Sequence, residues 1–292
     1  MNKQIYRKSL VYIAFVGPML ILFLLFIFLP FIRSIIYSFQ DWNGINSHTH
    51  WVGWKNYRNV LTDTDFARTI SFTLKYVLAT VIGLNVLGLI LAVALNVGLK
   101  SRNLLRTAFF LPTVMGTVII GFIWNFIITR LFPQIGELTG IGILHSSWLA
   151  LPKYAFWAII IVTVWHTLGY YMIIYLAGLQ GLSHELMEAA EIDGAGRIKR
   201  FWSIVLPLIR PSITICLFLS IINGFKSFDI NYSLTMGGPY GTTESISYQI
   251  FQDAFSKDLF SYASAKAVIF FLILTLFSVV QVAILKRKEV EA

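Results

Sequence analysis

Long apolar runs separated by short polar segments organise the whole chain. Charged side chains are absent from 9–32, 76–99, 107–129, 154–184 and 267–285. Each run is near or above the roughly 18–20 residues that a helix needs to cross ~30 Å of hydrocarbon. A sixth run, 204–222, contains Arg210 near its start, where a long side chain can still reach the headgroups. The pattern predicts six transmembrane helices, at roughly 10–32, 74–98, 107–129, 154–179, 204–224 and 266–285.

Composition supports the same interpretation. Hydrophobic residues make up 57% of the 292 positions and charged residues 13%, which is not the composition of a water-soluble globular domain. Basic residues precede the first apolar run, as in a signal peptide, but its apolar core is too long and no cleavage site follows, so we expect a retained anchor. The sequence predicts an all-α polytopic membrane protein, with residues 1–292 forming one transmembrane domain.

Lys and Arg are unevenly distributed between the polar segments. They are concentrated in 1–10, 100–106, 185–210 and 286–292, and are sparser in the longer segments between the other ends of the spans. Because basic loops stay on the cytoplasmic side, we expect both termini in the cytoplasm. The net charge of +9 is then explained by membrane topology and does not indicate nucleic-acid binding.

Segment 183–203 is the one sizeable cytoplasmic stretch between spans. Ser183 is a helix-capping residue type, acidic residues follow in the first turn, and glycines at 194 and 196 are expected to end the helix. A second helix is expected to begin near Arg197. The alternative is an amphipathic helix lying on the headgroups, but the acidic first half disfavours it. We therefore expect a rigid helix pair that docks onto a partner.

Polar and aromatic residues inside the spans have two possible uses. Asn85, Asn125, His166, Thr167 and Asn223 can form hydrogen bonds between helices, which is the more common role, or they can line a transport pathway. Aromatic residues of 154–184 and of 225–228 can belong to an interfacial belt or grip the C–H face of a sugar. The residues alone leave both questions open.

Several chemistries are not supported. The sequence has no phosphate-binding G-x-x-x-x-G-K-[ST] loop, no H-E-x-x-H and no nucleophile elbow. His166 has no second metal ligand at helical spacing, and the single cysteine, Cys216, lies mid-span. We predict no catalytic residue, no metal site and no cofactor bound by this chain, which is therefore not expected to be an enzyme.

One spaced motif resembles a known family. The pattern E-A-A-x3-G-x9-I-x-L-P runs from Glu188 to Pro207 and is similar to the signature loop of ABC importer permeases. The resemblance implies the type I importer permease (MetI-like) fold. It also implies that 183–203 is a coupling helix docking on a cytoplasmic ATPase, through Glu188, Ala189, Ala190, Asp193, Gly194 and Ala195.

Other segments resemble the carbohydrate-uptake branch of that family, of the multiple-sugar, raffinose and glycerol-3-phosphate type, related to the first maltose permease subunit. They are Asp41–Gly44, Val52–Gly53 with Asn56–Tyr57, Trp148–Leu149, and the run from Phe225 to Pro239. The chain departs from the usual pattern at Phe72, and it lacks the extra helices and outer domain of the maltose protein. By resemblance, the pathway residues are Trp165, Leu168, Gly169, Tyr170, Tyr171, Asn223, Phe225 and Phe228.

The resemblance implies a permease subunit in the bacterial plasma membrane that imports a carbohydrate, specifically an oligosaccharide. Its implied partners are a second homologous permease subunit forming a heterodimer, two ATP-binding subunits that hold ATP and Mg, and an extracellular solute-binding protein. Two alternatives stay open: a glycerol-3-phosphate or glycerophosphodiester permease, and an ion-coupled secondary carrier.

Overall fold

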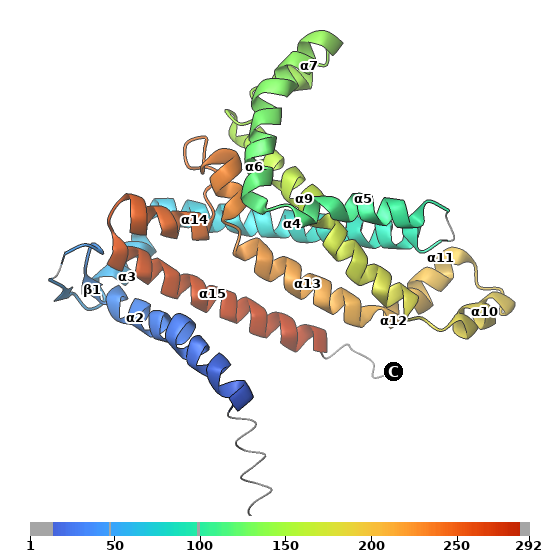
Figure 1. Cartoon of the computed structure of the whole chain (residues 1–292), viewed down its shortest axis with the longest axis horizontal. Helices are drawn as coiled ribbons and strands as arrows, with labels where there is room; N and C mark the ends of the chain where they lie inside the picture. Colours follow the sequence, from blue (N-terminus) through green and yellow to red (C-terminus); the bar gives the residue numbers. More distant parts are fainter. Residues whose placement is uncertain (1–13, 47, 98–99, 287–292) are drawn as a thin grey trace, which may run out of the picture. The chain divides into compact units, whose positions relative to one another are not determined.

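The computed structural model describes residues 14–46, 48–97 and 100–286. The chain divides into two compact units, which are described separately: unit 1 comprises 1–63 with 250–272, and unit 2 comprises 64–249 with 273–292. Figure 1 shows that helices dominate both. The prediction of a single domain over 1–292 stays a prediction.

Unit 1 begins with an exposed apolar helix, Ala14–Ser38, which includes η1 (Leu24–Phe28) and α2 (Leu29–Ser38). A small antiparallel pair follows, β1 (Gln40–Asp41) and β2 (His50–Trp51), and then α3 (Lys55–Thr62). The loops are ordered by their own side chains, because Asn43 Oδ1 accepts the backbone N–H of Asn46 at 2.9 Å and Asn56 donates to two carbonyls. The remainder of unit 1 includes η5 (Gln252–Ser256) and the first half of α15 (Phe260–Lys286).

A buried ionic cluster fixes unit 1 around Lys266. The Lys266 ammonium lies 2.7 Å from Asp253 and 2.9 Å from Asp63, and both Lys266 and Asp253 are almost fully buried. Tyr262 donates to Asp63 at 2.7 Å, and the exposed Lys257 lies 2.7 Å from the other oxygen of Asp253. These contacts join the end of α3, η5 and α15.

Unit 2 is built on long helices that pack against one another. α4 (Thr64–Leu95) contacts α9 (Pro152–Gln180) and α13 (Arg210–Phe225), and α5 (Arg102–Val114) also packs on α9. Figure 1 shows α6 (Thr117–Phe126) and α7 (Phe132–Thr139), joined through η2 (Ile127–Leu131), extending away from these helices. A short α8 (Gly142–His145) follows α7.

The predicted third span, 107–129, is divided in the structure. Its apolar run forms the end of α5 and the start of α6, with a break at Met115 and Gly116, and the membrane-length helix is Thr117–Thr139. Hydrophobicity alone did not reveal the break, because both halves are apolar. Pro112, in the last turn of α5, lacks an N–H, which weakens the helix ahead of this point.

The predicted span 204–224 is bent. α11 (Arg197–Arg200), η3 (Phe201–Val205) and α12 (Leu206–Leu208) form one arm, α13 forms the other, and the two meet at 69°. Pro207 and Pro211 flank the bend and cannot donate backbone hydrogen bonds. With this bent pair counted as one span, the described residues contain six apolar helices able to cross a membrane, in agreement with the expected number.

The segment after α13 folds back into unit 2. It contains η4 (Asn231–Thr235) and leads to α14 (Ile246–Phe251). Asn231 and Thr243 are fully buried there, and Asn231 Nδ2 donates to the Thr243 carbonyl at 2.8 Å.

Candidate functional site

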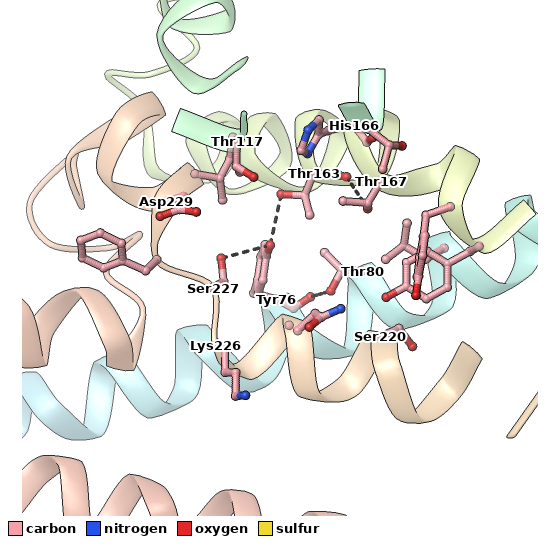
Figure 2. Close-up of a pocket in the computed structure, with 18 residues that line it drawn as sticks. Tyr76, Thr80, Thr117, Thr163, His166, Thr167, Ser220, Lys226, Ser227 and Asp229 are labelled. Carbon is pink, nitrogen blue, oxygen red and sulfur yellow. Dashed lines mark hydrogen bonds between the residues drawn. The ribbon is translucent and has the colours of Figure 1, made fainter. Parts of the chain in front are cut away.

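Unit 2 encloses a cavity of about 390 Å³, within the range of small-molecule sites. α4, α9 and α13 supply most of its walls, with contributions from the α5–α6 break and from the segment before η4. Figure 2 shows hydroxyl groups from these separate elements directed toward one another. The lining is Tyr76, Thr80, Leu84, Thr113, Thr117, Thr163, His166, Thr167, Tyr170, Tyr171, Ser220, Asn223, Gly224, Lys226, Ser227, Phe228, Asp229 and Ile230.

The polar lining follows helical spacing. Thr163 and Thr167 are four residues apart on α9, as are Tyr76 and Thr80 on α4, so each pair lies on one face of its helix. Thr167 Oγ1 donates to the Thr163 carbonyl at 2.8 Å, which satisfies its proton inside the apolar helix. Such hydroxyl groups retain lone pairs that can accept hydrogen bonds from a ligand.

Tyr76 connects three elements at the centre of the cavity. Its hydroxyl donates to Thr163 Oγ1 at 3.1 Å and lies 3.2 Å from Ser227 Oγ (Figure 2). Ser227 Oγ also lies 2.8 Å from Asn231 Oδ1. The ring of Tyr76 is almost fully buried. This chain of contacts fixes the positions of α4, α9 and the segment 227–231 relative to one another.

His166 belongs to the cavity wall and also holds the break between α5 and α6. Its Nε2 donates to the Met115 carbonyl at 3.0 Å, because a carbonyl can only accept, and Thr113 Oγ1 donates to the His166 carbonyl at 2.8 Å. The side chain is buried. This is the interhelical bonding that intramembrane polar residues most often provide, and it supplies a donor to the Met115 carbonyl at the break.

Asn85 and Asn125 have the same kind of role. Asn85 Nδ2 donates to Ser220 Oγ at 3.0 Å, and Asn85 Oδ1 accepts from Tyr175 at 2.6 Å, which ties α4, α13 and α9 together behind the cavity wall at Ser220. Asn125 Nδ2 donates to the Leu234 carbonyl at 2.7 Å and so fixes α6 to η4. Both side chains contribute to packing in unit 2.

Four of the pathway residues implied by the resemblance lie in the cavity wall: Tyr170, Tyr171, Asn223 and Phe228. Tyr171 is buried, Tyr170 is more open, and their rings meet edge to face at 5.6 Å. The Phe228 ring stacks on Tyr232 with an 8° angle between the planes. The cavity therefore has aromatic surface next to its hydroxyl groups.

The other four, Trp165, Leu168, Gly169 and Phe225, are not part of the cavity lining. Trp165 packs edge to face on Trp124, and the buried Phe225 packs on Phe277. Gly169 lies where α9 crosses α5, and a Cβ there would come 2.6 Å from Phe110 Cα. For the three residues on α9, helical periodicity explains the difference, because neighbours in sequence point to different sides of the helix.

Sequence reasoning did not select Tyr76, Thr113, Thr117, Thr163 or Ser227 for the pathway. The signal for Tyr76 and Thr163 was their four-residue spacing from Thr80 and Thr167 on the same helices, whereas Thr113 and Thr117 lie on either side of a helix break and Ser227 follows the end of α13. That spacing is common in packed membrane helices, so it identifies a face but not the cavity that the face lines.

The segment 183–203 forms the expected helix pair. α10 (His184–Ile192) ends where Gly194 adopts φ +76°, with hydrogen bonds from Ala195 N to the Ala190 carbonyl at 2.9 Å and from Gly194 N to the Glu191 carbonyl at 3.0 Å. This is a Schellman ending. Ser183 occupies the N-cap position, but its side chain makes no capping hydrogen bond. Arg200 on α11 pairs with Glu191 at 2.7 Å and links the two helices.

The residues assigned to coupling lie on and after α10. Glu188, Ala189, Asp193 and Gly194 are exposed, Ala195 is half-buried and Ala190 is buried. Large apolar side chains beside them are also open, with Ile192 86% and Ile198 78% exposed. In water such a surface is unfavourable unless a partner covers it.

Comparison with known proteins places this chain among transport proteins. The model of the family described as binding-protein-dependent transport system inner membrane component matches residues 85–290. A probable starch degradation products transport system permease protein, AmyD of Thermoanaerobacterium thermosulfurigenes, is 42% identical over 99% of this chain and 98% of that protein. The multiple sugar-binding transport system permease protein MsmF of Streptococcus mutans is 36% identical over 93% of each.

Solved structures agree on the fold. A crystal structure of a bacterial ABC transporter involved in the import of the acidic polysaccharide alginate includes a chain that matches with a TM-score of 0.82, 22% identity and 98% coverage of both chains. A second alginate transporter structure, in complex with a periplasmic protein bound to an alginate pentasaccharide, matches with a TM-score of 0.83. The expected helical permease fold is thus confirmed, and by its sequence the chain belongs to the binding-protein-dependent transport system inner membrane components, the membrane permeases of ABC transporters.

Proposed function

We propose that this permease imports a carbohydrate, specifically an oligosaccharide, and that the cavity of unit 2 is where it passes. The observation that carries the proposal is the cavity lining, which combines hydroxyl groups and Asn223 with the aromatic rings of Tyr170, Tyr171 and Phe228. Hydroxyl and amide groups can replace the hydrogen bonds that a sugar loses with water. Aromatic rings supply the apolar surface that the C–H face of a sugar ring needs.

The relatives support the same substrate class. They include permeases named for starch degradation products, for multiple sugars and, at 33% identity in Thermococcus litoralis, for trehalose and maltose. Membership of an ABC permease family favours this function over an ion-coupled carrier. The experiment below tests the alternative substrates, glycerol-3-phosphate and glycerophosphodiesters.

ATP hydrolysis by separate subunits drives transport in this proposal, and those subunits hold ATP and Mg. The α10–α11 pair docks into them, because it exposes apolar side chains such as Ile192 and Ile198 and is stiffened by the Gly194 ending and the Arg200–Glu191 pair. A second homologous permease subunit completes the membrane pore as a heterodimer. An extracellular solute-binding protein delivers the sugar, and both termini of this chain face the cytoplasm.

The test is reconstitution in proteoliposomes of this chain with its second permease, its ATPase and its solute-binding protein. A thermal-shift screen of that binding protein against neutral oligosaccharides, uronates and glycerophosphates first selects the labelled solute. We expect a neutral oligosaccharide to be selected and then accumulated only when ATP and the binding protein are both present. Selection and uptake of a glycerophosphate, or uptake without the ATPase, would refute the proposed function.

A further inference from the structure

The cavity contains very little formal charge. Among its described lining residues, Lys226 and Asp229 carry a full charge, and they are three positions apart in the segment between α13 and η4. Their environments differ. Figure 2 shows the Lys226 side chain running away from the cluster of hydroxyl groups around Tyr76 and Thr163, whereas Asp229 lies on the Thr117 side of that cluster.

The Asp229 carboxylate is open to the cavity. No hydrogen bond or ion pair to its oxygens is found within the described ranges, and no ion pair joins it to Lys226. Its backbone is nevertheless fixed, because its carbonyl accepts from Ser233 Oγ at 2.7 Å. The histidine of the lining, His166, uses its Nε2–H on the Met115 carbonyl. The backbone of Asp229 is therefore fixed, and its exposed carboxylate forms no ion pair with Lys226, the other charged residue of the described lining.

A carboxylate in this position treats neutral and anionic solutes differently. It is an acceptor only, so it can take hydrogen bonds from two neighbouring hydroxyls of a sugar, and such charge-assisted bonds are strong. A solute carboxylate or phosphate would instead meet a like charge at the cavity wall, and this repulsion would weaken its binding.

A helix-terminal role is the other explanation for an acidic residue here, because Asp229 begins the helical stretch that continues into η4. A negative charge at a helix N-terminus acts equally whether the bound solute is neutral or anionic, so this role predicts no preference between the two kinds of solute. The substitution Asp229→Asn keeps the shape of the side chain while removing its charge.

We propose that Asp229 makes the cavity selective for uncharged saccharides, by accepting hydrogen bonds from sugar hydroxyls and repelling solutes that carry a carboxylate or a phosphate. The inference rests on the proposed function, because it assigns a specificity to the same cavity. This selectivity would admit a neutral oligosaccharide and would disfavour an acidic polysaccharide or a glycerol phosphate.

The experiment measures the binding of saccharide probes to the assembled importer in nanodiscs. The solute-binding protein is left out, so that any preference between the probes comes from the permease. The probes are methyl glucoside and methyl glucuronide, which differ in a single group, and affinities come from saturation-transfer NMR titrations. We expect the wild type to prefer the glucoside about tenfold, which corresponds to about 1.4 kcal/mol. In Asp229→Asn the preference should fall below about threefold, and in the wild type it should narrow as salt rises.

Glu137→Gln is the matched control, because it removes one negative charge from the exposed surface of α7, outside the cavity. It should keep the wild-type preference. An equal preference in wild type and Asp229→Asn, or tighter binding of the glucuronide by the wild type, would overturn the assignment of Asp229 alone. If the wild type binds neither probe, the cavity is not a saccharide site, and the proposed function of the cavity fails together with the inference.

Discussion

The Tyr76 hydroxyl links α4, α9 and the segment 227–231 at the scale of a single residue. It is buried and contacts Thr163 and Ser227, whose side chains both face the cavity. A hydroxyl in this position fixes the geometry of groups that would hold a ligand, even where it does not contact the ligand itself. Binding sites depend on such support.

We expect Tyr76→Phe to raise the KM for solute uptake roughly threefold to tenfold, with a smaller effect on kcat, because the lining loses its fixed geometry. The loss of a buried hydrogen bond should also lower stability by about 1 kcal/mol. Uptake kinetics in proteoliposomes and thermal unfolding in detergent measure the two effects. Tyr154→Phe, on α9 but outside the cavity lining, is the control, and an equal rise in KM there would contradict the interpretation.

At the scale of elements, the helix pair α10–α11 depends on one backbone conformation. Gly194 has φ +76°, a region that side chains with a Cβ rarely adopt, and the neighbouring Gly196 has φ −61°. A Cβ at either position would meet no atom within 4 Å, so the two glycines differ in backbone strain and not in space.

We expect Gly194→Arg to abolish uptake while the assembled ATPase still hydrolyses ATP, because a strained ending changes the angle between α10 and α11 and places a large side chain on the docking surface. Gly196→Ala should keep uptake within about twofold of wild type. Parallel assays of uptake and ATP hydrolysis on each variant show whether transport is lost while hydrolysis is retained. Normal uptake by Gly194→Arg would remove this segment from coupling.

The ionic cluster of unit 1 is a second feature that acts between elements, because it joins the end of α3, η5 and α15. Lys266 and Lys257 both contact Asp253, but Lys266 is 1% exposed and the Lys257 side chain 57%. Removing one partner of a buried pair leaves an uncompensated charge, whereas an exposed pair contributes little.

Lys266→Met should therefore destabilise the protein by about 3–5 kcal/mol, and Lys257→Met by less than about 1 kcal/mol. Thermal unfolding of the purified variants in one detergent gives the comparison. The double variant Lys266→Met with Asp253→Leu should recover part of the loss, because it no longer buries a carboxylate that has lost its buried partner and keeps only the exposed Lys257. Similar unfolding temperatures for the two single variants would show that the cluster does not stabilise unit 1.

At the scale of the whole molecule, orientation in the membrane can be tested directly. The single cysteine, Cys216, is fully buried, so the native protein offers little background for thiol labelling. Ile192, on α10, and Tyr240, in the loop between η4 and α14, are 86% and 85% exposed. The proposed orientation puts them on opposite sides of the membrane.

We expect Tyr240→Cys to react with a membrane-impermeant maleimide in intact cells, and Ile192→Cys to react only after the cells are permeabilised. The reason is the concentration of Lys and Arg near 185–210, which favours the cytoplasm. Mass spectrometry of the purified variants measures the labelled fraction. The reverse pattern would invert the proposed topology, including the placement of both termini, which lie outside the described residues.

The sequence by itself determined the membrane class, the number of apolar spans and the position of the α10–α11 pair. These properties are local: hydrocarbon thickness sets the length of a span, and a glycine at a helix end acts within a few residues. Tyr170, Tyr171, Asn223 and Phe228 were also selected in advance, through a resemblance that concerns the same short segments.

Only the tertiary structure decided which faces meet. Tyr76, Thr163 and Ser227 are far apart in sequence, and they form one cavity wall because α4, α9 and the segment after α13 pack together. The break at Met115 is held by His166 from another helix, and the close approach of the α5 backbone leaves no room for a Cβ at Gly169. Lipid and protein neighbours are both apolar, so hydrophobicity cannot distinguish them, and the crossing of helices determines where a cavity can exist.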